Sequence, residues 1–240
     1  FLSNRSVLNN LHELVLRLEV FASSFDDLNS FGNGAFRVEA RPMASIGWAS
    51  DRSKPLSFGG KLGFMGEELG GNSFVHSLYA TWRPSDRLNV DAMLNYLNRE
   101  DWLLHSQGST MGTYQAEQFA PGFGLEYFIS AKQQLKLVVQ WVGVKARAHE
   151  AYSIPTLPGT LVRRADLDNT IPDFAVSQVS VQARYRWELA PLSDLFLVYT
   201  RQSNQSGLLQ DRSFTEVFSD SYQTPVTDAF VIKLRYRFGS

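Results

Sequence analysis

Strict alternation of apolar and polar residues runs through several segments of this chain and limits what it can fold into. Near the end of the chain, Lys233, Arg235 and Arg237 occupy every second position, and large apolar residues occupy the positions between. These apolar residues are Phe230, Ile232, Leu234, Tyr236 and Phe238. Residues 176–189 repeat the pattern. Because successive side chains of a β-strand point to opposite faces, the pattern predicts strands with one apolar and one polar face.

About ten such segments predict an all-β, antiparallel fold. They lie at residues 11–24, 34–49, 56–66, 73–82, 88–98, 116–129, 134–146, 174–189, 195–202 and 226–238. The third, seventh and ninth segments have mixed faces. No window approaches the ~20 apolar residues that a membrane helix needs. A mean hydropathy of −0.19 suits membrane strands, which show lipid only every second residue.

The lengths of the connections between these segments predict an up-and-down transmembrane β-barrel. Short polar connections at 49–55, 83–87, 130–133 and 190–194 follow every second strand. Connections at the other end include three long ones, at 99–115, 147–173 and 203–225. Short periplasmic turns and long extracellular loops are typical of outer-membrane barrels. We therefore expect residues 1–240 to form one barrel domain in a bacterial outer membrane, or the C-terminal part of a larger barrel.

Aromatic residues end each strand that runs towards the short turns, always on the apolar face. They are Trp48, Trp82, Tyr127, Trp187, Tyr236 and Phe238. Amphipathic rings favour the boundary between hydrocarbon and headgroups, so this set predicts a membrane-interface girdle. The alternative is that large aromatics fill the end of a soluble β-core.

The opposite face carries many charges, which predicts a wet barrel interior. The lumen-facing set is Arg17, Glu19, Arg37, Glu39, Arg41, Arg184, Arg186, Lys233, Arg235 and Arg237. Burying such residues unpaired in a dry core costs several kcal/mol each. A soluble lipocalin-like barrel would instead turn its apolar face inward. A formal net charge of −1 gives no basic field for nucleic acid, which we do not expect as a partner.

Few residues form a constellation that carries chemistry. The chain has no cysteine, and none of His12, His76, His105 and His149 has metal-ligand spacing. We expect neither cofactor nor catalysis, although His105 and His149 fall in loops where a hydrolase site would form. Asp166, Asp168 and Asp173 are the weak candidates for a Ca²⁺ site, and the favoured alternative is a solvated acidic loop. Residues 214–222 have near-helical apolar spacing, typical of a short helix at the mouth or of simple loop packing.

Four stretches carry a resemblance to a known family. They are WRPSDRL at 82–88, QWVGVKA at 140–146, ARYRWELAPLSDLFLVYTR at 183–201 and FVIKLRYRFGS at 230–240. The chain resembles, over most of residues 56–240, the C-terminal domain of unknown function of bacterial proteins that carry an N-terminal carbohydrate-binding family-nine-like domain. The resemblance implies an outer-membrane barrel, a natural chain that is longer at its N-terminus, and a native end at Phe238-Gly239-Ser240. It supplies no catalytic or binding residues.

The expected function is that of a porin-like channel or uptake component, or of a membrane anchor. Its partners would be outer-membrane lipid, and either a saccharide or a periplasmic or surface protein. Two alternatives stay open: a structural or assembly scaffold that docks a partner protein, and an outer-membrane hydrolase. Barrels near eight strands are filled by side chains, while those near sixteen hold open channels, so conduction depends on how many strands close the barrel.

Overall fold

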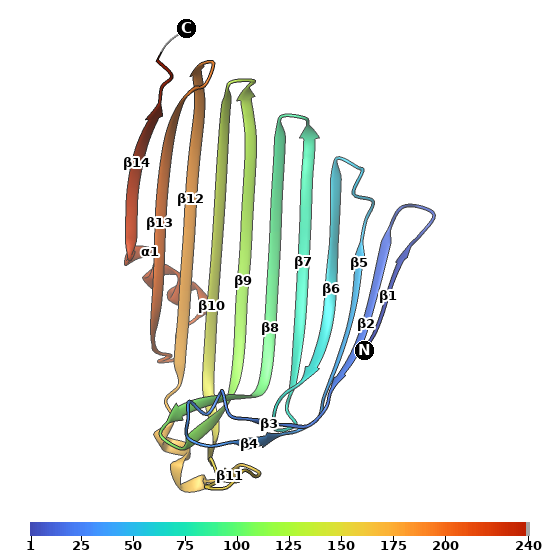
Figure 1. Ribbon diagram of the computed structural model, residues 1–240, viewed down its shortest axis with the longest axis vertical. Coiled ribbons are helices and arrows are strands. Elements are labelled where there is room, and N and C mark those ends of the chain that lie inside the picture. Colours follow the sequence, from blue (N-terminus) through green and yellow to red (C-terminus); the bar gives the residue numbers. More distant parts are fainter. Residues whose placement is uncertain (239–240) are drawn as a thin grey trace.

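The alternating segments form consecutive strands of one antiparallel sheet in the computed structural model, which describes residues 1–238 (Figure 1). The main strands are β1 (Leu2–Val7), β2 (Glu13–Phe21), β5 (Arg41–Ala49), β6 (Leu56–Gly66), β7 (Asn72–Ser85), β8 (Leu88–Gln107), β9 (Thr110–Ser130), β10 (Gln133–Ser153), β12 (Phe174–Ala190), β13 (Ser193–Leu208) and β14 (Thr227–Arg235). Each pairs with the next, and β11 (Val162–Arg163) joins the end of β10. The predicted all-β antiparallel class is confirmed.

The sheet is open in the described part of the chain. Its order runs from β1 to β14 without a pairing between these two edge strands, so the 12-stranded sheet does not close into a barrel. A closed barrel thus stays a prediction. Among residues 1–238, no helix has the length and apolar character that a membrane crossing requires.

Most predicted strands are present, with two differences near the N-terminus. The expected strand at 34–49 is two strands, β4 (Phe36–Val38) and β5, separated by Glu39 and Ala40. β4 pairs with β3 (Ser24–Asp26) in a separate two-stranded sheet. β1 was not predicted, because its sequence LSNRSV puts polar residues on both faces.

The short turns were predicted correctly, whereas the loop at 99–115 was wrong and the other two long loops are shorter than predicted. The short turns that join β1 to β2, β5 to β6, β7 to β8, β9 to β10 and β12 to β13 lie at one end of the sheet, at the top of Figure 1. At the other end, β8 and β9 continue through the expected loop to a tight turn at Gly108, whose φ is +52°. β10 and β13 likewise extend to Ser153 and Leu208. At the tips of β8 and β9 the alternation fades because buried clusters cover both sides of these strands.

The pairing register places residues on two chemically distinct faces, because directly opposed residues of an antiparallel pair share a face. One row joins Leu14, Trp48, Gly60, Leu78 and Leu94 across five strands. We call the face that carries this row the apolar face. It continues across the remaining strands with Phe123, Leu125, Leu137, Val139, Val181, Ala183, Leu195, Leu197, Phe230 and Ile232. The other face is the polar face.

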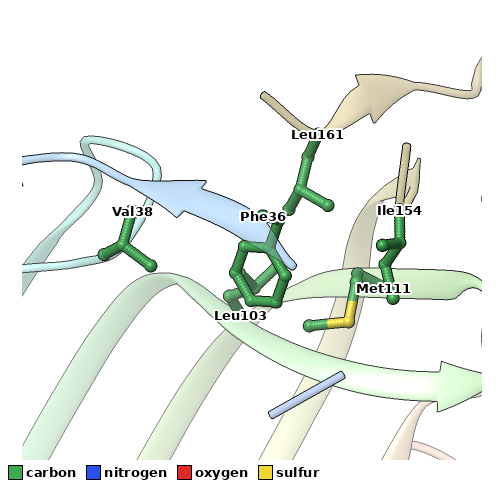
Figure 2. Close-up of a cluster of buried hydrophobic side chains, with 6 residues drawn as sticks. All are labelled: Phe36, Val38, Leu103, Met111, Ile154 and Leu161. Atoms are coloured by element: carbon green, nitrogen blue, oxygen red, sulfur yellow. The ribbon is translucent and has the colours of Figure 1, made fainter. Parts of the chain in front are cut away.

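Buried side chains concentrate in a cap at the loop end. The cap comprises β3, β4, the tips of β8–β10, β11 and η1 (Ala165–Thr170), a 3₁₀ helix. Figure 2 shows Phe36 of β4 surrounded by Leu103, Met111 and Leu161. A second cluster, around Tyr114 and Ile171, covers the other side of the same strand tips. A β4 bridge to Gly159 lets the β2–β5 connection reach across the loop end.

Candidate functional site

Most of the charges predicted to line an interior do lie on the polar face. By register these are Arg17, Glu19, Arg41, Arg184, Arg186, Lys233 and Arg235. Three others lie elsewhere. Arg37 belongs to β4 in the cap, Glu39 lies in the link before β5, and Arg237 follows the end of β14. The prediction was wrong for Arg37 and Glu39, because the alternation continues across the break at residues 39–40 while the backbone turns away.

Asp194 joins three strands at the turn end of the polar face. Its side chain is 2% exposed and accepts hydrogen bonds from Arg186 of β12 at 2.9 Å and Arg235 of β14 at 2.6 Å. Without this carboxylate, two guanidinium groups would face each other across β13. Arg186, Asp194 and Arg235 lie in the segments 183–201 and 230–240 that carry the family resemblance. Their convergence depends on the strand register.

We expect Asp194→Asn to lower the free energy of unfolding by about 1–3 kcal/mol, because a neutral amide leaves two charged donors poorly satisfied. Urea unfolding in lipid vesicles measures this change. The matched control is Asp228→Asn, whose carboxylate pairs with Arg201 but is 43% exposed, and which should change stability by less than about 1 kcal/mol. Equal losses for the two variants would contradict a special role for Asp194.

A hollow of about 380 Å³ opens on the polar face over β2, β5, β6 and β7. Arg17, Lys61, Glu13 and Tyr79 line it. Glycines make the space. A Cβ at Gly59 would lie 2.5 Å from the hydroxyl oxygen of Tyr79, so the ring lies where a side chain would otherwise stand. Two cations, a carboxylate and an aromatic ring suit a polar or anionic solute. Sequence reasoning missed Lys61 and Tyr79, although the glycine-rich stretch 59–63 was the available signal.

Charged side chains in the cap form a second polar cluster. Arg163 makes two hydrogen bonds of 2.6 Å to Asp168 and lies 3.3 Å from Glu150. Tyr152 donates to Glu150. Burial, together with that carboxylate, raises the pKa of Tyr152 to about 12. The Tyr152 hydroxyl and Arg163 hold the pKa of Glu150 below its ordinary value, and Arg163 does the same for Asp168.

These pKa shifts predict that the cap loosens in acid. A carboxyl whose pKa is lower in the folded state stabilises the fold above its unfolded pKa of about 4, and that stability disappears as pH falls through the folded value. We expect amide-exchange protection of residues 147–170, corrected for intrinsic rates, to drop below about pH 4. In Arg163→Gln, which lacks the shared partner, this extra acid sensitivity should shrink. Protection that is unchanged at low pH would contradict the expectation.

Glu67 forms a buried ion pair where β6 and β7 meet at the loop end. Its side chain is fully buried and accepts from Arg99 at 2.8 and 2.7 Å and from Ser73. Burial opposes its ionisation, but the Arg99 and Ser73 hydrogen bonds outweigh this, and its pKa is lowered. For the neighbouring Glu68, burial raises the pKa although Arg41 lies 2.5 Å away. The Glu67–Arg99 pair fixes the β6–β7 connection to β8, and the Glu68–Arg41 pair fixes it to β5.

Comparison with known families decides the membership of the chain. Residues 13–238 match the family model described as a domain of unknown function, DUF5916. The chain belongs to this family. The expected membership of an uncharacterised family is thereby confirmed, and the match begins well before residue 56. No curated protein and no solved structure matches the chain.

In this DUF5916 chain the candidate calcium ligands are engaged separately. Asp166 pairs with Arg164, Asp168 pairs with Arg163, and Asp173 accepts from the backbone N–H of Ala148 at 2.7 Å. Among residues 1–238, no three acidic or histidine side chains converge as metal ligands do. Asp166, Asp168 and Asp173 thus serve the cap, and the structure does not bring them together.

The candidate catalytic histidines of the DUF5916 chain also lie apart. His149 Nδ1 is 2.7 Å from Asp101 Oδ1, while His105 Nε2 is 2.7 Å from the carbonyl oxygen of Gly108. Within the described residues, neither histidine has a hydrogen bond to serine or threonine. The described residues thus contain the Asp101–His149 pair but no Ser–His–acid triad.

Proposed function

We propose that this chain is a membrane-spanning sector of a bacterial outer-membrane β-barrel whose polar face lines a solute path. The observation that carries the proposal is the apolar face, which presents large exposed side chains in a continuous sheet. Leu78, Phe230 and Ile232 are 61%, 62% and 64% exposed. Contiguous apolar surface of this extent marks contact with a membrane or a partner rather than with water.

The height of the apolar band supports a membrane crossing. Shorter apolar runs face outward on β10 and β13. On β7, β8, β9, β12 and the segment that starts in β14, the outward residues are apolar, apart from His76, over the intervals 74–82, 88–96, 119–127, 179–187 and 230–238. Each interval has nine residues, within the range of about 9–11 that a tilted membrane strand uses. Polar residues resume on the same face on the loop-end side of these intervals, at Asn98, Glu117, Lys145 and Arg201.

The step between girdle residues supports the tilt of a barrel. Starting from Trp82, each of Tyr127, Trp187 and Tyr236 lies two residues nearer the turn end than the row through the girdle residue before it. A shift of two residues across two strand spacings corresponds to a tilt of about 35°. Barrel strands tilt by about 35–45°. At that tilt these four residues share one level, and the rising tops of the hairpins in Figure 1 follow the same stagger.

The two edges of the sheet must be paired in lipid, because unsatisfied backbone groups are not tolerated there. β1 and β14 both run from the loop end to the turn end, so they cannot pair antiparallel with each other. Antiparallel closure therefore takes an odd number of further strands, from the same polypeptide or from another. A barrel enlarged in this way approaches the strand numbers that leave room for a channel.

The polar face supports a role in solute passage or uptake. It combines paired charges with the hollow around Arg17, Lys61 and Tyr79, and these groups suit an anionic solute or a saccharide. A link to carbohydrate handling is part of the proposal on the strength of the family resemblance alone. Membrane anchoring without conduction is the second function that the same apolar face supports.

Planar-bilayer recording with the protein purified from native membranes tests the solute path. We expect discrete conductance steps, and we expect Lys61→Glu with Arg17→Glu to shift ion selectivity towards cations. The control is Lys54→Glu, which reverses a charge in the β5–β6 turn. Absence of conductance from protein that resists alkaline extraction would reject the channel and favour the anchor. Complete release by alkaline extraction would reject the membrane barrel.

A further inference from the structure

Helix α1 (Phe214–Gln223) lies on the apolar face, not in the mouth of the proposed barrel. Ser213 and Glu216 form a capping box at its start. Val217 is buried against Ala175 and Leu209. Ser221 is fully buried and bonds to Ser203 of β13, which is on the apolar face by its pairing row. A helix that plugged the interior would contact the polar face instead.

An aromatic cluster joins α1 to the sheet. The ring of Trp141 lies 5.2 Å from Phe218, 5.8 Å from Phe119 and 6.1 Å from Phe214, between centroids. Its indole N–H donates to Ser177 at 2.9 Å, so the buried polar atom is satisfied. A Cβ at Gly143 would lie 2.6 Å from the Trp141 ring, which makes glycine necessary for this packing. The helix is therefore held firmly at this position.

The position of α1 coincides with the outer limit of the apolar band. Trp141 pairs with Val179, which lies eight residues nearer the loop end than the girdle residue Trp187 on β12. Eight residues of a strand tilted by about 35° rise about 22 Å. The outward apolar band of outer-membrane barrels is about 25 Å tall. The helix thus lies where hydrocarbon meets headgroups, as amphipathic interfacial helices do.

An apolar groove separates α1 from the strands beside it. The groove has a volume of about 390 Å³ and is lined by Phe119, Pro121, Phe123, Val139, Phe214 and Phe218, with Trp141 and Gly122. Thr215 contributes the one polar side chain among its described lining residues. A site of this size and character suits a hydrocarbon ligand and offers no partner for a charged one.

We propose that this groove holds one acyl chain of an outer-leaflet membrane lipid. The inference rests on the proposed membrane position of the apolar face. Two observations favour an acyl chain over another occupant. The floor residues Phe123 and Val139 continue directly into Leu125 and Leu137, so the groove opens along the band that faces hydrocarbon. The groove also sits at the level where acyl chains join their headgroups.

Photolabelling tests the lipid site. The natural protein is reconstituted in phosphatidylethanolamine vesicles that contain a phospholipid with a diazirine on its acyl chain, and labelled peptides are mapped by mass spectrometry. When the protein is exchanged into unlabelled lipid before irradiation, we expect labelling to persist on residues 119–123, 139–141 and 214–218. Elsewhere on the apolar face, such as at Leu78 and Ile232, labelling should be lost on exchange.

Groove-filling variants make the test specific. Thr215→Trp and, independently, Val139→Phe should lower persistent labelling about tenfold, the effect of losing a weakly held ligand. The matched control Ile232→Trp adds bulk to the same face outside the groove and should leave persistent labelling of the groove peptides unchanged. Groove peptides that lose label as fast as Leu78 overturn the lipid site but leave the membrane barrel intact. The lipid site is also overturned if a bound polypeptide occupies the groove and prevents its labelling. Absence of label on the whole apolar face overturns both proposals.

Discussion

Leu78→Arg is expected to lower the free energy of unfolding by about 2–4 kcal/mol in a lipid bilayer. Leu78 lies at the centre of the interval 74–82 on the apolar face and is 61% exposed. In water, charging so exposed a position changes stability by less than about 0.5 kcal/mol. At the midplane of a membrane the guanidinium must leave water, and the cost is correspondingly larger. The same substitution thus separates a membrane sheet from a soluble one.

Asn95→Arg is the matched control for Leu78→Arg. Asn95 pairs with Ser77, the neighbour of Leu78, and lies on the polar face. Both variants would be unfolded with guanidinium in the same vesicles, followed by tryptophan fluorescence and by the heat-dependent electrophoretic shift of folded barrels. We expect Asn95→Arg to remain within about 1 kcal/mol of the unaltered protein. A tolerated Leu78→Arg would show that this face does not meet lipid.

Phe36→Ala is expected to destabilise the cap by about 3–5 kcal/mol, the usual cost of truncating a buried phenylalanine. Phe36 is 1% exposed and packs between the β8–β9 tip and the chain around Ile154 and Leu161 (Figure 2). Because the long strands are paired independently of this cluster, the loss should be local. Amide-exchange protection should fall at residues 24–38 and 154–161 and persist in β7 and β12.

Leu28→Ala is the control for the cap, because Leu28 belongs to the same β3–β4 connection but is 83% exposed. It should leave the exchange pattern unchanged. If Phe36→Ala removes protection from β7 as well, the cap and the sheet unfold as one unit, and the expected local loss is wrong. If Phe36→Ala has no effect, the cluster does not hold the cap in place.

Alternation predicted the membrane-length parts of the strands well because one side of each of them lacks protein contacts. Residues 174–189 illustrate this, since Val181 to Trp187 alternate with Gln182 to Arg186 and the observed β12 spans Phe174–Ala190. At the loop end the same rule failed. The extension of β8 through Trp102 and Leu103 has buried clusters on both sides, which removes the polar partner from the pattern. The sequence of residues 99–115 therefore lacks the alternation of a strand and was predicted to be a loop.

Features that depend on register were not predictable from the sequence. The convergence of Arg186 and Arg235 on Asp194 requires three strands to be aligned, and no spacing within the chain encodes it. A short helix at 214–222 was one of two alternatives, and its place on the apolar face was not predicted, because amphipathic spacing does not say which surface a helix covers. Arg37 shows the reverse error, since an unbroken alternation concealed a break in the backbone.

Single-cysteine scanning along β12 tests whether the apolar face meets lipid and the polar face meets water. The chain contains no cysteine of its own, so each introduced cysteine reports alone. Residues 179–187 would be replaced one at a time, and the folded protein in vesicles treated with a water-soluble maleimide. We expect reactivity with a period of two. Cysteines at Ser180, Gln182, Arg184 and Arg186 react, while those at Val181, Ala183, Tyr185 and Trp187 are protected by lipid. Val179 is 3% exposed, so a cysteine there is protected by the protein itself. Equal reaction on both faces, or reaction confined to the odd-numbered positions, would contradict it.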